Sequence, residues 1–249
     1  MAIPSSGSVS LQDIEDEFGG TGQISLSEYY RGNTYETLVS GNNTTVPQSG
    51  TIKFSQFRGS FQARYLTWKL LGAGGGGGYG LQNGGGSGTA PNGGDSTLTY
   101  SGTTNTSTGG AGGDNGSIYY TDTGSAGQNA DTSQSYSENF GTSGGETPQD
   151  QNGAAGSGFG AGGSGGGGDL PDQYDSSGNK GEGGLAGQET SGNVYLALSS
   201  SMVYDLGVGG AGSTGGNQNG ADGLNGLVVI TSNGSEVVRT STDGTYTVV

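Results

Sequence analysis

Acidic and amide side chains are the groups of this chain best suited to hold a metal ion. They gather at positions 169–175, which read Asp-Leu-Pro-Asp-Gln-Tyr-Asp, and at Asp114-Asn115-Gly116. Ca²⁺ takes such oxygen ligands, but a dedicated calcium loop supplies them in a full run that neither cluster has. We therefore expect solvated surface loops at both places, with a calcium site as the alternative, and no cofactor.

Catalytic side chains are scarce. The chain has no cysteine and no histidine, which excludes thiolate nucleophiles, zinc clusters and Ser–His or Cys–His pairs. Matches to G-x-G-x-x-G are frequent, but none has the following helix and acidic residue of a dinucleotide site, and Lys180 stands outside any phosphate-binding loop motif. The paired carboxylates of a glycosidase cannot be recognised from sequence, so a sugar-cleaving enzyme stays an alternative. We expect a protein that is not an enzyme.

Aromatic residues in the polar middle of the chain are the stronger indication of a binding surface. Tyrosine among Ser, Gly and Asn is also the composition of antibody paratopes, where a stiff ring gives contact area at low entropic cost. The alternative is that several of these rings cap the ends of a packed glycine-rich unit. We predict receptor contact by Tyr119, Tyr120, Tyr136, Phe140 and Tyr174, and Phe159 lies in the same stretch.

Glycine determines how these residues can be positioned. Of the 59 glycines, eight precede Gly72 and two follow Gly226, which leaves 49 between them. Glycine loses the most backbone freedom on ordering, so such a stretch needs something other than a side-chain core. Without Cβ, neighbouring chains approach closely enough for their backbones to pair, as at the collagen axis, although only five prolines and no strict Gly-X-Y period exclude collagen itself. We predict a mainly β fold with a bundle of glycine-rich polyproline-II or polyglycine-II helices.

Composition limits the partners. Only 28% of the chain is hydrophobic, and its net charge of −15 repels nucleic acid and anionic membrane surfaces. Met1 to Ser10 lacks a signal-peptide pattern, and no run of about 18 apolar residues occurs. We expect neither nucleic-acid binding nor membrane insertion.

The first sixty residues contain a threefold repeat of the form small-Gly-x-aliphatic-x-(Leu/Phe)-x-x-apolar. The spacing predicts a short extended piece that enters one helical turn, with capping-box pairs at Ser10 and Asp13 and at Ser25 and Glu28. We predict a small mixed module over 1–60 that either packs on itself or docks onto a partner. Its apolar positions are Val9, Leu11, Ile14, Ile24, Leu26, Tyr29, Ile52, Phe54 and Phe57.

The second domain is predicted over 61–249. Aromatic and aliphatic residues at 63–71 indicate a strand that runs directly into the glycines, and Asp243-Gly244 predicts a hairpin at about 235–249. Further strands are predicted at 96–100, 117–121, 194–198, 202–207 and 227–231.

Several motifs resemble known proteins. The stretches Pro4-Ser5-Ser6-Gly7-Ser8-Val9-Ser10-Leu11, Ile24-Ser25-Leu26-Ser27-Glu28-Tyr29-Tyr30-Arg31-Gly32 and Val46-Pro47-Gln48-Ser49-Gly50-Thr51-Ile52 resemble a module of structural and tail-fibre proteins of tailed bacteriophages, including cyanophages. The stretches Trp68-Lys69-Leu70-Leu71-Gly72-Ala73-Gly74 and Asp205-Leu206-Gly207-Val208-Gly209-Gly210 are similar to glycine-rich domains of phage tail-fibre adhesins.

The resemblance implies a non-enzymatic virion protein, a short tail fibre or fibre tip that binds a host glycan or protein. It also implies attachment to other virion proteins through residues 1–60 and a homo-oligomer, preferably a trimer. The alternatives are a purely structural capsid or baseplate decoration or fibre-forming protein, and a polysaccharide-degrading tail spike.

Overall fold

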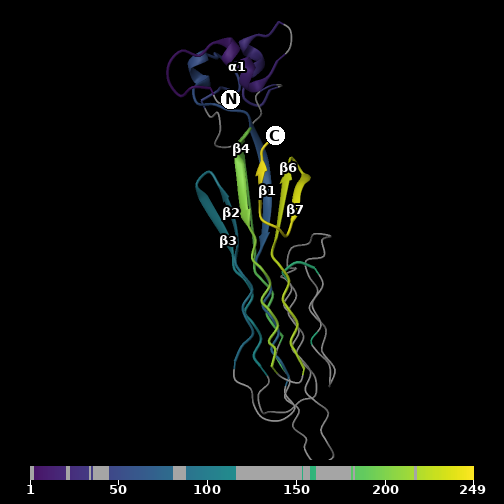
Figure 1. Ribbon diagram of the computed structural model, residues 1–249. Helices are drawn as coiled ribbons and strands as arrows, with labels where there is room; N and C mark the ends of the chain where they lie inside the picture. Colours follow the sequence, from purple (N-terminus) through teal and green to yellow (C-terminus); the bar gives the residue numbers. More distant parts are fainter. Residues whose placement is uncertain are drawn as a thin grey trace, which may run out of the picture.

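The computed structural model has three parts arranged in series along one elongated molecule (Figure 1). A small helical module lies at one end, two β-sheets lie in the middle, and glycine-rich segments extend to the other end. Both chain ends labelled in Figure 1 lie near the module. The structure describes residues 3–20, 23–33, 35, 45–80, 88–115, 153, 158–160, 181, 183–215 and 218–249.

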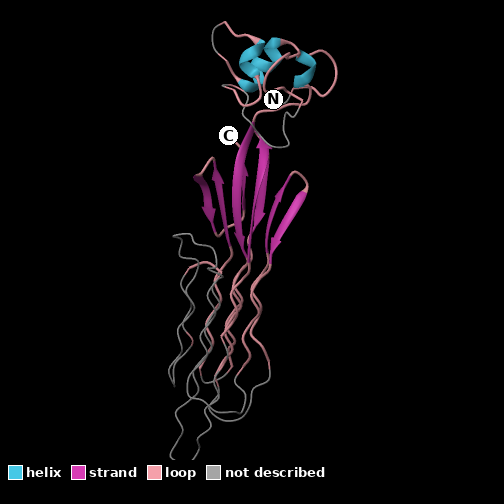
Figure 2. Ribbon diagram, turned by 180° about the vertical axis from the view of Figure 1, so that it is seen from behind, coloured by secondary structure: helices cyan, strands magenta, loops and turns pink. Residues whose placement is uncertain are grey.

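The module consists of three short helices and the loops that join them (Figure 2). They are the α-helix α1 (Leu11–Phe18) and the 3₁₀ helices η1 (Leu26–Tyr29) and η2 (Phe54–Phe57). Each helix starts at the Leu or Phe of one sequence repeat, so the predicted change from extended chain to helical turn is confirmed in all three copies. The first copy continues for eight residues and ends at Gly19, whose φ of +80° suits glycine.

The middle part contains two antiparallel four-stranded sheets, which confirms the prediction of a mainly β fold. The first sheet has the strand order β4-β1-β6-β7 and the second the order β3-β2-β5-β8. The strands are β1 (Ala63–Leu71), β2 (Ser96–Tyr100), β3 (Thr103–Ser107), β4 (Glu189–Ala197), β5 (Ser201–Asp205), β6 (Leu227–Ser232), β7 (Ser235–Thr240) and β8 (Gly244–Thr247).

The main hydrophobic core lies between the two sheets. Alternate residues of β1, Leu66, Trp68 and Leu70, join Leu98 of β2 and Met202 of β5 in one buried cluster. The period of two along each strand places these side chains on one face. The intervening residues of β1 therefore occupy the opposite face of the first sheet.

Trp68 explains a glycine within β4. Its indole lies over Gly192, its register partner, so a Cβ at Gly192 would lie 2.6 Å from the ring atom Cζ2. The indole nitrogen also donates a 3.2 Å hydrogen bond to the hydroxyl of Tyr100. A central aromatic side chain thus ties both sheets together.

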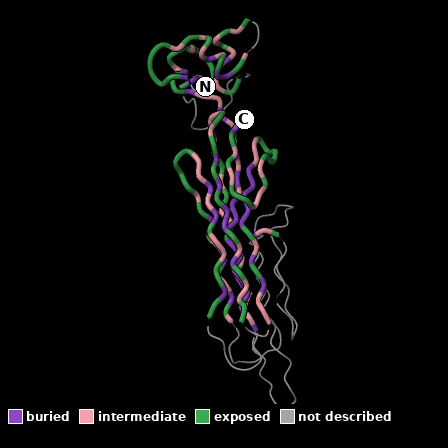
Figure 3. Tube along the Cα trace, in the orientation of Figure 1, coloured by how far each residue is buried: buried purple, intermediate pink, exposed green. Residues whose placement is uncertain are grey.

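The glycine-rich part consists of extended segments that continue directly from the strands (Figure 1). Segment 72–80 follows β1, segment 88–95 leads into β2, and segment 108–115 follows β3. Segment 183–188 leads into β4, segment 206–215 follows β5, and segment 218–226 leads into β6. We call these six segments the glycine bundle; the middle of the molecule, where sheets meet bundle, is rich in buried residues (Figure 3).

The predicted hairpin at 235–249 is wrong. Strand β7 pairs with β6 of the first sheet, whereas β8 pairs with β5 of the second, so residues 241–243 connect the two sheets. The hairpin turn is instead Asn233-Gly234, with φ values of +49° and +83° that suit these residue types. The carboxylate of Asp243 accepts a 2.7 Å hydrogen bond from the amide of Leu206, and this bond holds the connection beside the second sheet.

The other strand predictions differ from the structure mainly at their ends. The strands at 63–71 and 96–100 are confirmed with the same bounds, and those near 194–198, 202–207 and 227–231 correspond to β4, β5 and β6. The strand predicted at 117–121 lies outside the described residues. Strand β3 is additional; its sequence Thr-Thr-Asn-Thr-Ser has no alternation of apolar and polar residues to predict it.

Candidate functional site

The central segment of the glycine bundle, 72–80, donates hydrogen bonds with a period of three residues. Consecutive amides point to three different neighbours, and the fourth returns to the first. The bonds are Gly72 to Gln188 (2.9 Å), Ala73 to Gly94 (3.1 Å), Gly74 to Leu224 (2.9 Å), Gly75 to Leu185 (2.9 Å), Gly76 to Pro91 (3.0 Å) and Gly77 to Ala221 (2.8 Å). Because the partner numbers fall as the donor numbers rise, all three neighbouring segments are antiparallel to 72–80.

The carbonyls of the same segment serve two further neighbours. Amides of segment 108–115 donate to Ala73 and Gly76, and amides of segment 206–215 donate to Gly74 and Gly77, at 2.8 to 2.9 Å. Both sets of partners again repeat every three residues, and here donor and acceptor numbers rise together. Segment 72–80 is therefore bonded to all five other segments of the bundle.

Close approach of the backbones makes glycine necessary at the contact points. A Cβ built on Gly75 would lie 2.0 Å from the carbonyl oxygen of Ala111, and one on Gly76 would lie 2.0 Å from that of Ala211. A Cβ on Gly223 would lie 2.1 Å from the carbonyl oxygen of Gly74. These contacts are with backbone atoms, so no rotamer change could relieve them.

Side chains accept hydrogen bonds from several amides on the outside of the bundle. Asn92 and Asp95, three residues apart, each accept a 2.9 Å bond, from Gly112 and Gly109 respectively. Asp222 and Asn225 repeat this arrangement on another segment, accepting from Gly212 at 2.7 Å and from Gly209 at 3.0 Å. The spacing Asx-x-x-Asx among glycines, which the sequence analysis passed over, is the signal for these two ladders.

Buried serines bridge the junction between the sheets and the bundle. The hydroxyl of Ser96, fully buried, donates to the carbonyl of Leu71 at 2.8 Å and accepts from the amide of Gly207 at 3.0 Å. Its register partner Ser107, also buried, donates to the carbonyl of Gln188. These bonds satisfy backbone groups where the strand ladders end and the bundle begins.

The helical module uses the same local contact in each repeat. The residue before each helix donates its amide to the side chain three positions later: Ser10 to Asp13 (2.7 Å), Ser25 to Glu28 (3.1 Å) and Lys53 to Gln56 (2.6 Å). In the first copy the Ser10 hydroxyl also accepts from the amide of Asp13 at 3.1 Å. The predicted capping boxes at Ser10 and Asp13 and at Ser25 and Glu28 are both present. The Ser25 hydroxyl is also bonded to that of Ser27.

Two ionisable groups of the module have shifted pKa values. The hydrogen bond from the Ser10 side chain, followed by that from its backbone, lowers the pKa of Asp13 because both favour the carboxylate. Burial, followed by the charge of Glu15, raises the pKa of Tyr29. The Tyr29 hydroxyl donates a 2.7 Å hydrogen bond to the carbonyl of Gly19. This bond links the C-terminal end of α1 to η1.

The apolar positions of the three repeats divide into buried and more accessible residues. Ile14, Tyr29 and Phe57, the last apolar residue of each repeat, are fully buried in one cluster. Phe54 is 41% exposed. The remaining predicted attachment residues are half-buried at the edge of that cluster: Val9, Leu11, Ile24, Leu26 and Ile52. The module thus packs on itself, and of these positions only Phe54 and the half-buried residues reach its surface.

The module is bonded to the chain that leads into β1. Glu17 of α1 is 5% exposed, and its carboxylate accepts a 2.7 Å hydrogen bond from the amide of Gln62. Ile3 and Ser60 are joined by a 3.0 Å backbone bond. Both contacts lie where the module meets the sheets.

The predicted receptor residues Tyr119, Tyr120, Tyr136, Phe140 and Tyr174 lie outside the described residues. Phe159 is described, and it packs against Leu71, Leu227 and Val229 beside the junction of sheet and bundle. For this ring the structure favours the packing alternative over receptor contact.

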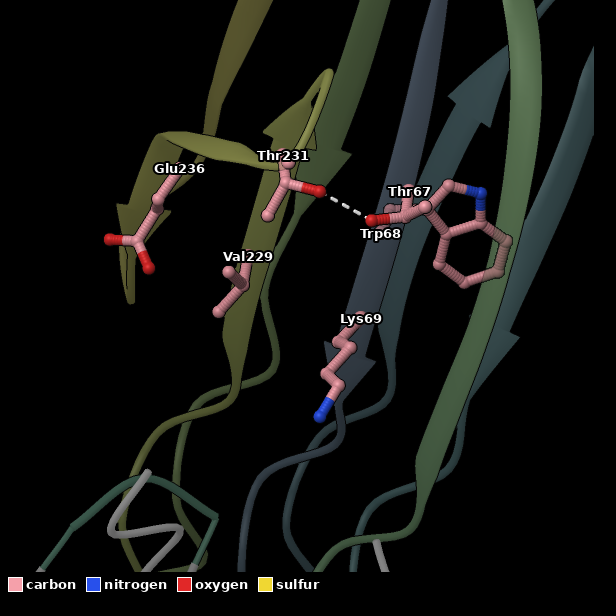
Figure 4. Close-up of a pocket in the computed structure, with 7 residues that line it drawn as sticks. Thr67, Trp68, Lys69, Val229, Thr231 and Glu236 are labelled. Atoms are coloured by element: carbon pink, nitrogen blue, oxygen red, sulfur yellow. Dashed lines mark hydrogen bonds between the residues drawn. The ribbon is translucent and has the colours of Figure 1, made fainter. Parts of the chain in front are cut away.

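A pocket lies on the face of the first sheet that points away from the core. Its volume is about 380 Å³, and its lining includes Thr67, Lys69, Val229, Thr231 and Glu236. Figure 4 shows Lys69 and Val229 on the side of the sheet opposite the Trp68 ring. This surface could not be predicted from the sequence, because β1 lies far in the chain from the hairpin of β6 and β7 that supplies the other residues.

The oxygen atoms of the candidate calcium cluster at Asp114 and Asn115 are used within the protein. Asp114 accepts from the hydroxyl of Thr89 at 2.9 Å, and Asn115 accepts from the amide of Tyr79 at 3.2 Å. Among the described residues no group of three or more acidic side chains is suited to hold a metal ion. Positions 169–175 lie outside them. In the same part of the chain no helix has the length and apolar character to cross a bilayer.

Comparison with known proteins gives no match to a protein-family model, to a curated protein or to a solved structure.

Proposed function

We propose that this chain is a non-enzymatic virion protein of a tailed bacteriophage, a short tail fibre or fibre tip. In this proposal the module of residues 1–60 binds other virion proteins, and the glycine-rich part is presented to the host cell surface.

The segments of the glycine bundle are, in this proposal, polyglycine-II helices. That helix has three residues per turn and no internal hydrogen bonds, so its amides are free to bond sideways. The three-residue period of the bonds made by 72–80 supports the assignment. At about 3.1 Å per residue, the nine residues of this segment would span roughly 28 Å.

The observation that carries the proposal is the arrangement of module, sheets and bundle in series (Figure 1). A fibre protein needs one end that joins the particle and a distal end held away from it. In the bundle, lateral backbone bonds supply the order that a side-chain core supplies elsewhere, so an elongated shape needs few apolar residues. Surface-exposed residues of the module such as Phe54 are available to a partner.

Electron microscopy of the particle that contains this chain tests the proposal. Antibodies to residues 1–60 should label the base of a tail appendage, and purified protein should compete with the particle for adsorption to host cells. Label on the capsid or baseplate surface, without competition, would favour the purely structural alternative. Release of oligosaccharides from host polysaccharide by the purified protein would favour the tail spike.

A further inference from the structure

The outer face of the first sheet, away from the core, carries an aromatic pair beside a polar pocket. We call this surface the open face; its principal side chains are Tyr65, Tyr195, Thr67, Thr231, Lys69 and Glu236. Strand alternation places them together, since Leu66, Trp68 and Leu196 on the same strands belong to the core.

The two tyrosines form a platform. Tyr65 of β1 and Tyr195 of β4 are register partners, with ring centroids 5.0 Å apart and planes inclined by 46°. Tyr65 is 37% exposed, a large value for an aromatic ring on a central strand. The negative face of such rings attracts polarised C–H groups, which line one side of a pyranose ring.

Hydrogen-bonding groups lie next to this platform. Thr67, two residues and about 6.6 Å along β1 from Tyr65, has its hydroxyl bonded to that of Thr231 on β6 (Figure 4). A bulge in β7 places Glu236 opposite Thr231, at the far side of the pocket. Hydroxyl and carboxylate groups of this kind fix the orientation of a ligand that is itself rich in hydroxyls.

The charges of the open face balance. Lys69 lies 4.0 Å from Glu189, and Arg239 forms a 2.8 Å ion pair with Glu236. Two of only seven basic residues thus neutralise two carboxylates here, in a chain of net charge −15. A neutral ligand is favoured, because among the described residues of this face the basic side chains are paired with carboxylates.

We infer that the open face binds a neutral saccharide, with one sugar ring stacked on Tyr65 and Tyr195 and the next in the adjoining pocket lined by Thr67, Lys69 and Glu236. This inference rests on the proposed function, because it names the class of ligand that the protein would bind on the host cell surface. It assigns the ligand to the sheets rather than to the predicted receptor residues of the glycine-rich part.

Titration of the full-length protein with soluble neutral oligosaccharides tests the inference without particle or cells. The probes are glucose-, galactose- and mannose-based tri- to hexasaccharides, with uronic-acid oligosaccharides as charged comparisons, followed by NMR or calorimetry. Tyr65→Ala should raise the Kd of the neutral ligand at least tenfold, and Tyr65→Phe should leave it within threefold. Val203→Ala, on the outer face of the second sheet and 50% exposed, is the matched control and should leave Kd unchanged.

Three results would overturn the inference. The first is the absence of binding by any neutral oligosaccharide at 10 mM. The second is binding that Tyr65→Ala leaves intact while its melting temperature is unchanged. The third is a self-associated protein that Tyr65→Arg dissociates, because the open face would then be an interface between copies. None of these bears on the tail-fibre proposal, which the labelling of particles decides separately.

Discussion

A single methyl group added to the glycine bundle should discriminate between backbone contact and loose packing. A Cβ on Gly93 would lie 2.2 Å from the carbonyl oxygen of Ala73, whereas ordinary contact begins at 3.4 Å. The two segments would have to separate by the difference, about 1.2 Å. The neighbouring residue Gly94 is the matched control, because its Cβ would come no closer than 3.1 Å to any atom.

The expected cost of Gly93→Ala follows from two hydrogen bonds. The amide of Ala73 donates to Gly94 at 3.1 Å, and that of Gly76 donates to Pro91 at 3.0 Å, so both bonds join the two segments that would separate. A 1.2 Å separation would carry both beyond the length of a hydrogen bond, at about 1–1.5 kcal/mol each. Alanine also lowers the conformational entropy of the unfolded chain, which offsets about 0.5–1 kcal/mol of this loss in folding free energy. Gly93→Ala should therefore destabilise by about 2 kcal/mol, and Gly94→Ala by less than about 0.5 kcal/mol.

Urea denaturation followed by Trp68 fluorescence measures the free energy of unfolding of both variants. Hydrogen exchange of the amides of Ala73 and Gly76 reports on the bundle itself and should accelerate only in Gly93→Ala. Equal stability and equal exchange in the two variants would refute the view that backbone contacts order this part of the molecule.

Three further predictions concern the side-chain ladder, the module and the oligomer. Asp222→Ala should speed hydrogen exchange at the amide of Gly212 and cost about 1 kcal/mol, whereas Asp222→Asn keeps the acceptor oxygen and should change little. Because the pKa of Asp13 is lowered in the folded state, its stabilising contribution is present above its ordinary value of 3.8 and is lost as the pH falls through the folded value. An NMR titration should show this, and Ser10→Ala should raise that pKa. Sedimentation equilibrium should give about three times the chain mass of 24.5 kDa if the trimer forms.

Each of these has a clear contrary result. Unchanged exchange at the Gly212 amide in Asp222→Ala would show that the hydrogen bond to Asp222 does not stabilise the bundle. If Ser10→Ala leaves the pKa of Asp13 unchanged, the hydrogen bond from the Ser10 side chain does not lower that pKa. A single species of 24.5 kDa at all concentrations would reject the trimer.

Local patterns in the sequence predicted local structure well. The Ser10 and Asp13 capping box and the strand at 63–71 were both recognisable, because each depends on residues a few positions apart. Strand β3 was missed since its side chains are all polar, and it is ordered by pairing with β2 and by the left-handed turn at Ser101 and Gly102. The hairpin at 235–249 was wrong because β7 pairs with β6 through the Asn233-Gly234 turn, whereas β8 pairs with β5, which lies far earlier in the chain.

The candidate binding surface could not be predicted from the sequence. Tyr65 and Tyr195 are 130 positions apart, and only the register of β1 with β4 brings them together. Likewise Thr67 and Thr231 meet because β6 pairs with the other side of β1. The residues predicted to contact a receptor lie outside the described part of the chain, so they stay predictions.

The sequence by itself determined that the glycine-rich part has no side-chain core and that the first sixty residues repeat a short structural unit. Both follow from composition and spacing, which act locally. Only the tertiary structure decided which segments lie beside 72–80, which glycines must lack a Cβ, and that the C-terminal strands belong to different sheets. Those features depend on hydrogen bonds between residues far apart in the chain, and backbone groups carry no sequence signal that specifies their partner.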